Sequence, residues 1–229
     1  KTINKLNTLK ITIPQDSRAL TSNFSNKGKT SFVEYYAAYF KPWDAGVDFD
    51  RTALQNLLYK RPRRLAENYA VIPEPFFTTL ENNANLAALD TLKLKAIIIQ
   101  NTHLRILPTN SYLFGDVNEP GEGYPFDYAQ DDFLRIGEPI LISHYTKDGV
   151  FAYVKTSSGA NGFVLSQDLV AVDAKYIAAY RKNLIMLSND SLANLNQHAT
   201  VQLYLGTILP IINNKIFIPG RNAEGKADL

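Results

Sequence analysis

The sequence contains no cysteine among its 229 residues, and this absence excludes several kinds of chemistry. Without a thiol, the chain has no disulfide, no thiolate zinc site, no iron–sulfur cluster and no cysteine nucleophile of its own. Its three histidines, His103, His144 and His198, lack the spacing of a metal-binding helix. No Gly-x-Ser-x-Gly sequence accompanies them. We therefore expect no metal site and no cofactor, and we interpret the histidines as solvated or structurally bonded.

Charge and long apolar runs are also scarce. The 24 Lys and Arg residues nearly balance the 22 Asp and Glu residues, which leaves a net charge of +2 and indicates no nucleic-acid partner. No apolar run approaches the roughly 20 residues that span a bilayer, so we expect no membrane span. With 45% hydrophobic residues, the chain can nevertheless bury a core.

Residues 1–95 are predicted to form an N-terminal helical region. Ser31 and Glu34 have the spacing of a capping box, the pattern of a helix start. Behind them an aromatic stripe recurs at helical spacing, formed by Phe32, Tyr35, Tyr36, Tyr39 and Phe40. We expect Pro42 to end this helix, and Tyr39, Phe40 and Trp43 to pack on a neighbouring domain; a ligand platform is the alternative.

Two further helical patterns follow in this region. One starts at Asp50 and stops near Pro62, and the other lies between Pro75 and Asp90. Isolated helices of this length are marginal in water, so we expect both to dock on another part of the chain.

From Lys95 the pattern changes to short strands. Apolar or alternating segments cover residues 96–100, 104–107, 139–145, 150–155 and 163–165. A loop rich in Gly and Pro occupies residues 109–132, and Asp148-Gly149 has the sequence of a hairpin turn. This arrangement predicts a small antiparallel barrel of the SH3-like type over residues 96–173.

A second barrel is predicted over residues 182–229, after a helical linker at 174–181. Three strand-like segments lie at 183–187, 201–210 and 215–218, fewer than the five strands of an SH3-like barrel. The predicted fold class is therefore mainly β with an N-terminal helical region and tandem SH3-like barrels, the second incomplete. We expect the chain to end inside a domain.

Residues 96–172 resemble the first bacterial SH3 domain of cell-wall endopeptidases of the NlpC cysteine-peptidase family. The resemblance is carried, in order, by residues 101–109, 123–130, 137–140, 147–149 and 161–164. Residues 39–43 are similar to the clip-like N-terminal region of the same proteins, and residues 183–229 to the start of their second SH3-like domain. Phe151 and Phe163 stand where the family usually has tryptophan.

The resemblance implies an exported, periplasmic peptidoglycan hydrolase that cuts between γ-D-glutamate and a diamino acid of the stem peptide. The family's cysteine and histidine belong to a catalytic domain beyond the second SH3-like domain, so no catalytic residue is assigned in this chain. Since the chain starts at Lys1 without an initiator Met, it is interpreted as a mature or engineered form. The implied partners are murein stem peptides and a C-terminal cysteine-peptidase domain or chain.

Five residues are candidates for substrate contact: Arg105, Asp127, Gln130, Tyr145 and Tyr153. Arg105 has the chemistry to bind a carboxylate of a stem peptide, with an internal ion pair to Asp127 or Asp131 as the alternative. Asp127 and Gln130 are candidates for hydrogen bonding to the peptide or for holding the loop. In the alternative, Asp127 caps a turn and Phe126 fills the barrel.

Four aromatic residues, Tyr145, Phe151, Tyr153 and Phe163, could form a stacking surface for a sugar or a peptide. Alternation places Phe151 and Tyr153 on one strand face, and Ala152 and Val154 on the other. We expect at most one of these faces to be free to bind, and core packing is the alternative for the aromatic set. The Arg61, Arg63 and Arg64 cluster is interpreted as a solvated helix end, with contact to an anionic wall polymer as its alternative.

Two hypotheses for function follow. In the first, this chain is the non-catalytic N-terminal part of the endopeptidase, positions the catalytic domain and admits only short stem peptides with a free amino end. In the second, it is a stand-alone module that binds peptidoglycan or scaffolds a hydrolase and has no enzymatic activity.

Overall fold

The computed structural model describes residues 31–44, 48–60, 63–196 and 199–228. It contains two units, residues 1–35 and 36–229, and the second unit holds all of the β-structure described below. Among the described residues, no helix combines the length and the apolarity needed to cross a membrane.

Two of the N-terminal helices begin where local side chains satisfy backbone groups. Ahead of α3 (Phe32–Tyr39), the predicted capping box forms: Glu34 N–H donates to Ser31 Oγ over 3.2 Å, and Ser31 N–H donates to Glu34 Oε2 over 2.8 Å. The helix ends at Tyr39, before Pro42. Pro42 lies instead in the first turn of α4 (Lys41–Asp44), where a missing N–H costs no helical hydrogen bond, so the prediction that it ends the helix was wrong.

The next helices are α5 (Arg51–Tyr59), α6 (Glu74–Asn83) and the short 3₁₀ helix η1 (Leu86–Ala88). Asp50 Oδ1 caps α5 by accepting from the N–H groups of Thr52 and Ala53. α5 buries Leu54 and Leu58 and α6 buries Phe77 and Leu80, so both short helices dock on the rest of the chain, as expected. Their buried residues join the strand residues Leu141, Phe151, Tyr153 and Phe163 in one cluster.

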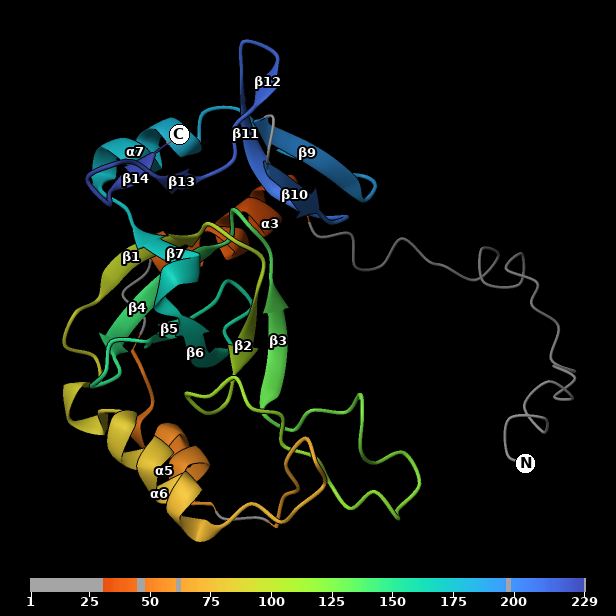
Figure 1. The fold of residues 1–229 in the computed structure, drawn as a ribbon. Helices are drawn as coiled ribbons and strands as arrows, with labels where there is room; N and C mark the ends of the chain where they lie inside the picture. Colours follow the sequence, from red (N-terminus) through yellow and green to blue (C-terminus); the bar gives the residue numbers. More distant parts are fainter. Residues whose placement is uncertain (1–30, 45–47, 61–62, 197–198, 229) are drawn as a thin grey trace, which may run out of the picture. The chain divides into compact units, whose positions relative to one another are not determined.

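The central sheet has seven antiparallel strands in the order β3-β2-β6-β5-β4-β1-β7 (Figure 1). The strands are β1 (Leu94–Ile98), β2 (Thr102–Arg105), β3 (Gln130–Leu134), β4 (Pro139–Tyr145), β5 (Phe151–Lys155), β6 (Asn161–Leu165) and β7 (Leu169–Ala171). The 3₁₀ helix η2 (Ser166–Asp168) precedes β7. The mainly β fold with an N-terminal helical region is confirmed, but β3 and β7 end the order unpaired with each other, so the sheet is no closed barrel.

Both faces of β5 are buried. Phe151 and Tyr153 pack against the residues of α5 and α6, whereas Ala152 and Val154 pack with Ile98, Ile140 and Ile142 on the opposite face. We expected at most one face of this strand to be free to bind, and in the structure neither face is free. The docked helices cover the aromatic face, which alternation within the strand alone does not reveal.

Beyond the sheet, α7 (Ala174–Tyr180) leads into small two- and three-stranded sheets. They comprise β8 (Leu184–Met186), β9 (Ser191–Asn196), β10 (Ala199–Leu203), β11 (Ile208–Ile212), β12 (Lys215–Ile216), β13 (Gly220–Arg221) and β14 (Ala227–Asp228). β9 pairs with β10, β11 pairs with β8 and β12, and β13 pairs with β14. The described residues after α7 therefore form no closed barrel either.

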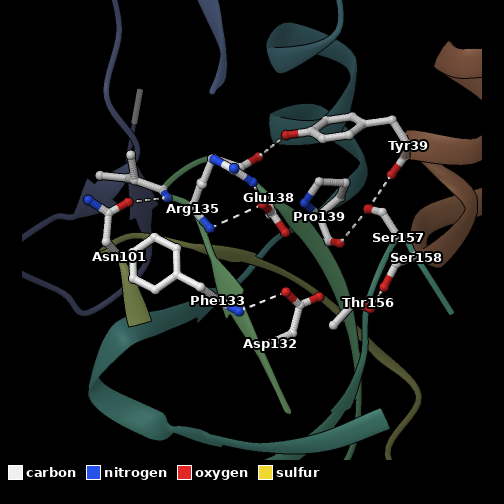
Figure 2. Close-up of polar contacts among 12 residues, drawn as sticks. Tyr39, Asn101, Asp132, Phe133, Arg135, Glu138, Pro139, Thr156, Ser157 and Ser158 are labelled. Carbon is white, nitrogen blue, oxygen red and sulfur yellow. Dashed lines mark hydrogen bonds and ion pairs between the residues drawn. The ribbon is translucent and has the colours of Figure 1, made fainter. Parts of the chain in front are cut away.

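Tyr39, Asn101 and Ser157, from three separate segments of the chain, lie around the turn between β3 and β4 (Figure 2). Ser157 Oγ donates to the carbonyl oxygen of Tyr39 over 2.6 Å. Asn101 accepts from Ile136 N–H at 2.9 Å and donates to the carbonyl oxygen of Gln202 at 2.6 Å. The amide of Asn101 thus ties the sheet to β10.

The three aromatic residues expected at a domain junction lie at this same side of the sheet. Phe40 and Trp43 are buried in a cluster with Ile97, Val170 and Tyr180, and Tyr39 packs against its edge. The indole Nε1–H of Trp43 donates to the carbonyl oxygen of Ala96 over 2.8 Å.

Candidate functional site

The long loop between β2 and β3 forms the candidate site (Figure 1). A pocket of about 580 Å³ opens in it, lined by Ile106, Gly121, Pro125, Phe126, Asp127, Tyr128, Gln130 and Asp131. The loop contains a cis peptide bond between Tyr124 and Pro125. Of the five candidate substrate residues, only Asp127 and Gln130 line this pocket.

Arg105 lies beneath the loop and holds it together. Its Nη1 is 2.5 Å from Asp127 Oδ2, its Nε donates to the Thr109 carbonyl oxygen at 2.9 Å, and its Nη2 donates to the Ser111 carbonyl oxygen at 2.6 Å. The side chains of Arg105 and Asp127 are only 6% and 2% exposed. All three guanidinium nitrogens have internal partners, so the ion pair that we weighed against a substrate contact forms in the structure.

Asp127 also organises the backbone of the loop. Its Oδ1 accepts from Leu113 N–H at 3.0 Å and from Ala129 N–H at 2.9 Å. Phe126, its neighbour, is 57% exposed rather than enclosed in a barrel, so the alternative in which Phe126 fills the barrel was wrong. The pocket lining therefore contains the buried carboxylate of Asp127 and the exposed ring of Phe126.

Two more aromatic residues of the loop are exposed, and one of them, Tyr128, also lines the pocket. Tyr124 is 73% exposed and Tyr128 is 40% exposed. Tyr128 donates its hydroxyl to Glu122 Oε1 over 2.5 Å, and this hydrogen bond raises the pKa of the phenol. The guanidinium of Arg64 lies 3.9 Å from the centre of the Tyr128 ring, a cation–π contact that fixes the ring.

The exposed polar groups of the pocket come from the first residues of β3. Gln130 and Asp131 are both exposed, at a register shift in the pairing of β2 with β3. Gln130 N–H donates to the carbonyl oxygen of Asp127 at 3.2 Å. An amide and a carboxylate therefore stand beside exposed aromatic rings, which is a surface able to hydrogen-bond a polar ligand and to bind its amino group.

Tyr145 and Tyr153 do not reach this pocket. Tyr153 is 1% exposed, packs against Phe49 and Phe163, and has its pKa raised to about 12 by burial. Tyr145 is half-buried and packs on the opposite cluster of the sheet, where burial raises its pKa. Both placements favour core packing, the alternative considered for these aromatic residues.

The described histidines have structural surroundings. Burial lowers the pKa of His144, whose Nε2 lies 2.9 Å from the Ala84 carbonyl oxygen and whose Nδ1 lies 2.9 Å from Ser143 Oγ. A neutral ring that donates from Nε2 and accepts at Nδ1 satisfies both contacts. His103 lies on β2 and packs its ring on Phe133. Within the described segments no three His, Cys, Asp or Glu side chains gather as metal ligands.

Sequence reasoning missed several residues around the pocket: Arg64, Glu122, Tyr124 and Tyr128. Three aromatic residues in alternation within a loop rich in Gly and Pro are a signal that could have found the exposed rings. In the basic cluster, Arg63 forms an ion pair with Asp116 at 3.2 Å. Arg61 and His198 lie outside the described residues.

Comparisons with known proteins agree with this architecture. Residues 113–164, which include most of the pocket loop, match the SH3 domain model of the SH3b1 type. A solved structure of an NlpC/P60 endopeptidase from Photobacterium damselae subsp. piscicida matches with a TM-score of 0.82 and 23% sequence identity. The match covers 96% of this chain and 56% of that chain, so this chain spans little more than half of its length. No curated protein matches the chain. The chain therefore contains an SH3 domain of the SH3b1 type, set in a fold that it shares with an NlpC/P60 endopeptidase.

Proposed function

We propose that this chain is the non-catalytic part of an exported peptidoglycan endopeptidase, and that it restricts the stem peptide admitted to a separate catalytic domain. The observation that carries the proposal is the fold match, which covers nearly all of this chain but little more than half of an NlpC/P60 endopeptidase. A chain without cysteine supplies no thiolate nucleophile, so the catalytic cysteine and histidine belong to a domain outside these residues.

The β2–β3 loop is the segment best suited to restrict the substrate. Its backbone is fixed by the buried Arg105–Asp127 pair, and the first residues of β3, directly after it, expose the amide of Gln130 and the carboxylate of Asp131. A rigid loop excludes a peptide that is too long, and a carboxylate attracts a free amino end. We assign Gln130 and Asp131 to substrate contact, and Arg105, Tyr145 and Tyr153 to structural support.

The boundaries of the proposed parts remain those of the sequence: a helical region at 1–95, the SH3b1-type domain at 96–173 and a second SH3-like segment from 182. The partners proposed are murein stem peptides and a C-terminal cysteine-peptidase domain or chain, in the periplasm or another exported location. The γ-D-glutamyl-diamino acid bond is the proposed site of cleavage.

The test uses the gene product that contains this chain together with its catalytic domain. Cleavage of free stem tripeptide is compared with cleavage of intact crosslinked sacculi. For Gln130→Ala and Asp131→Asn we expect kcat/KM for the free peptide to fall about five- to tenfold, the effect of losing one hydrogen bond to a charged group. Glu224→Gln, in the exposed turn between β13 and β14, is the matched control and should leave both activities unchanged.

A deletion of residues 96–173 provides the result that could contradict the proposal. If selectivity for the free peptide over sacculi survives that deletion, the loop does not restrict the substrate and the proposal fails. Calorimetry of the isolated 229-residue chain with a sugar-free stem peptide tests the rival function, a stand-alone binding module. Tight binding without any catalytic domain would support that rival.

A further inference from the structure

Three aromatic rings, those of Tyr69, Phe114 and Tyr112, stand in a row, and none of them lines the pocket described above. Phe114 is the central ring: its centroid lies 5.6 Å from that of Tyr112 and 5.8 Å from that of Tyr69. Phe114 is 3% exposed, whereas Tyr112 is 40% exposed and Tyr69 is 47% exposed. Two solvent-facing rings therefore flank a buried one, and the Tyr112 ring stacks on Phe114 with an interplanar angle of 29°.

The backbone beneath these rings is firmly held. Leu65 N–H donates to the Phe114 carbonyl oxygen at 2.9 Å, and Phe114 N–H donates to the Leu65 carbonyl oxygen at 2.8 Å. Leu65 also forms a bridge to Val71, which closes the turn that carries Tyr69. Tyr69 N–H donates to the Ala66 carbonyl oxygen at 2.8 Å. The exposed rings are thus held in place before any ligand arrives, which lowers the entropic cost of binding.

Tyr69 has an unfavourable backbone conformation for its residue type. Its φ is 61°, in the left-handed region where glycine or asparagine costs less than a bulky aromatic residue. The ring is about half exposed, so burial does not compensate fully for this cost. Backbone outliers of this kind concentrate at binding sites, where the strained residue serves function rather than stability.

A pocket of about 500 Å³ begins beside Tyr112, within the size range of small-molecule sites. It is lined by Ala66, Glu67, Asn68, Ala70, Val71, Ile72, Pro73, Phe76, Ser111 and Tyr112. Glu67 is the one charged residue in this lining, and Asn68 and Ser111 add polar groups. The pocket shares no lining residue with the pocket in the β2–β3 loop.

We propose that the ring row and its pocket bind a neutral β-linked N-acetylhexosamine chain, the chemistry of a glycan strand. A pyranose ring presents a flat face of C–H groups, which stacks on the negative face of an aromatic ring. Its hydroxyl and acetamido groups then hydrogen-bond to side chains of the kind supplied by Glu67, Asn68 and Ser111. Because Glu67 is the one charged residue in the lining, the pocket has few groups that could form ion pairs with a charged peptide or a polyphosphate. This site is separate from the proposed stem-peptide pocket and does not depend on it.

The test titrates the 229-residue chain with chitotetraose, a β-1,4-linked N-acetylglucosamine tetramer, by calorimetry and by NMR shift mapping. We expect saturable binding and shifts confined to residues 65–73 and 111–114. Tyr112→Ala should weaken binding about tenfold, which corresponds to about 1.4 kcal/mol. Tyr69→Gly should also weaken it, yet leave the chain at least as stable to urea, because glycine accepts the positive φ without strain.

Tyr59→Ala is the matched control, because Tyr59 is also an exposed tyrosine, at 51%, but lies on α5 outside the pocket lining. It should bind chitotetraose like the unmodified chain. Absence of binding at millimolar sugar overturns the proposal, as does binding that Tyr112→Ala leaves unchanged. Binding of a proline-rich peptide in place of the sugar also overturns it, since such peptides dock on aromatic grooves as well.

Discussion

The hydroxyl groups of Tyr39 and Tyr180 converge on one acceptor, the carbonyl oxygen of Gly137, and each lies 3.0 Å from it. Tyr39 comes from α3, Tyr180 ends α7, and Gly137 lies in the turn between β3 and β4. The Tyr180 hydroxyl is also 2.9 Å from the Ile208 carbonyl oxygen. One turn of the sheet is thereby bonded to the segments that precede and follow it.

Replacing each of these tyrosines by phenylalanine should destabilise the chain by different amounts. Tyr180 is fully buried and its hydroxyl serves two carbonyl oxygens, so we expect Tyr180→Phe to lower the free energy of unfolding by about 1–3 kcal/mol. Tyr39→Phe leaves the Gly137 carbonyl oxygen with its second donor and should cost about 0.5–1 kcal/mol. Urea denaturation measures both values. A smaller loss for Tyr180→Phe than for Tyr39→Phe would contradict this account.

Gly137→Ala tests how closely the segments approach at this turn. An alanine Cβ would lie 2.7 Å from the Ile208 carbonyl oxygen and 2.7 Å from the Tyr180 hydroxyl, and φ is +91°. Gly149 also has a positive φ, +72°, but nothing lies within 4 Å of its Cβ position. We expect Gly149→Ala to cost about 1 kcal/mol from backbone strain alone, and Gly137→Ala about 2–4 kcal/mol. If thermal unfolding shows that both variants lose the same stability, the turn at Gly137 can accommodate a Cβ atom without a clash.

Local sequence signals predicted the helix starts well. The capping box of Ser31 with Glu34 and the N-cap Asp50 depend on residues within one turn, and both occur as expected. Strand β3 was missed, because Gln130, Asp131 and Asp132 look like a polar loop. They form an edge strand, bonded on one side only, whose first residues face solvent and need no apolar pattern.

Burial of Tyr153 and exposure of Phe126 could not be predicted from neighbouring residues. Tyr153 is enclosed because α5 and α6, distant in sequence, cover its face of the sheet. Phe126 faces solvent next to Asp127, whose carboxylate turns inward to Arg105 on another strand. In the candidate site, the residue types were therefore visible in the sequence, but which of them reach solvent depended on tertiary contacts.

Breaking the charge pair beneath the candidate pocket should strongly destabilise the chain. Arg105→Met leaves the Asp127 carboxylate buried without its cation, which costs about 3–5 kcal/mol for a buried pair. The exposed Asp131 serves as control, and Asp131→Asn should change stability by less than about 0.5 kcal/mol. Urea denaturation gives the values, and hydrogen exchange at Leu113 and Ala129 reports whether the loop opens first. A loss below about 1 kcal/mol for Arg105→Met would mean that the pair does not hold the loop.

Glu138 should make stability depend on pH in a defined window. Burial raises its pKa from the ordinary value of 4.5 to about 7, although hydrogen bonding from Arg135 N–H at 3.1 Å acts in the opposite direction. Between these two pKa values the folded chain keeps the proton while the unfolded chain releases it, so stability falls as the pH rises from 4.5 to 7 and then levels off.

Glu138→Gln removes this ionisation and should be tested across that window. The difference in free energy of unfolding between this variant and the unmodified chain should be near zero at pH 4.5. It should then rise in favour of the variant by about 1.4 kcal/mol per pH unit, to as much as about 3 kcal/mol above pH 7. Glu224→Gln, at an exposed glutamate, is the matched control and should show no such trend. Urea denaturation at half-unit pH steps measures the difference. A flat difference for Glu138→Gln would mean that the folded chain does not raise the pKa of this carboxyl group.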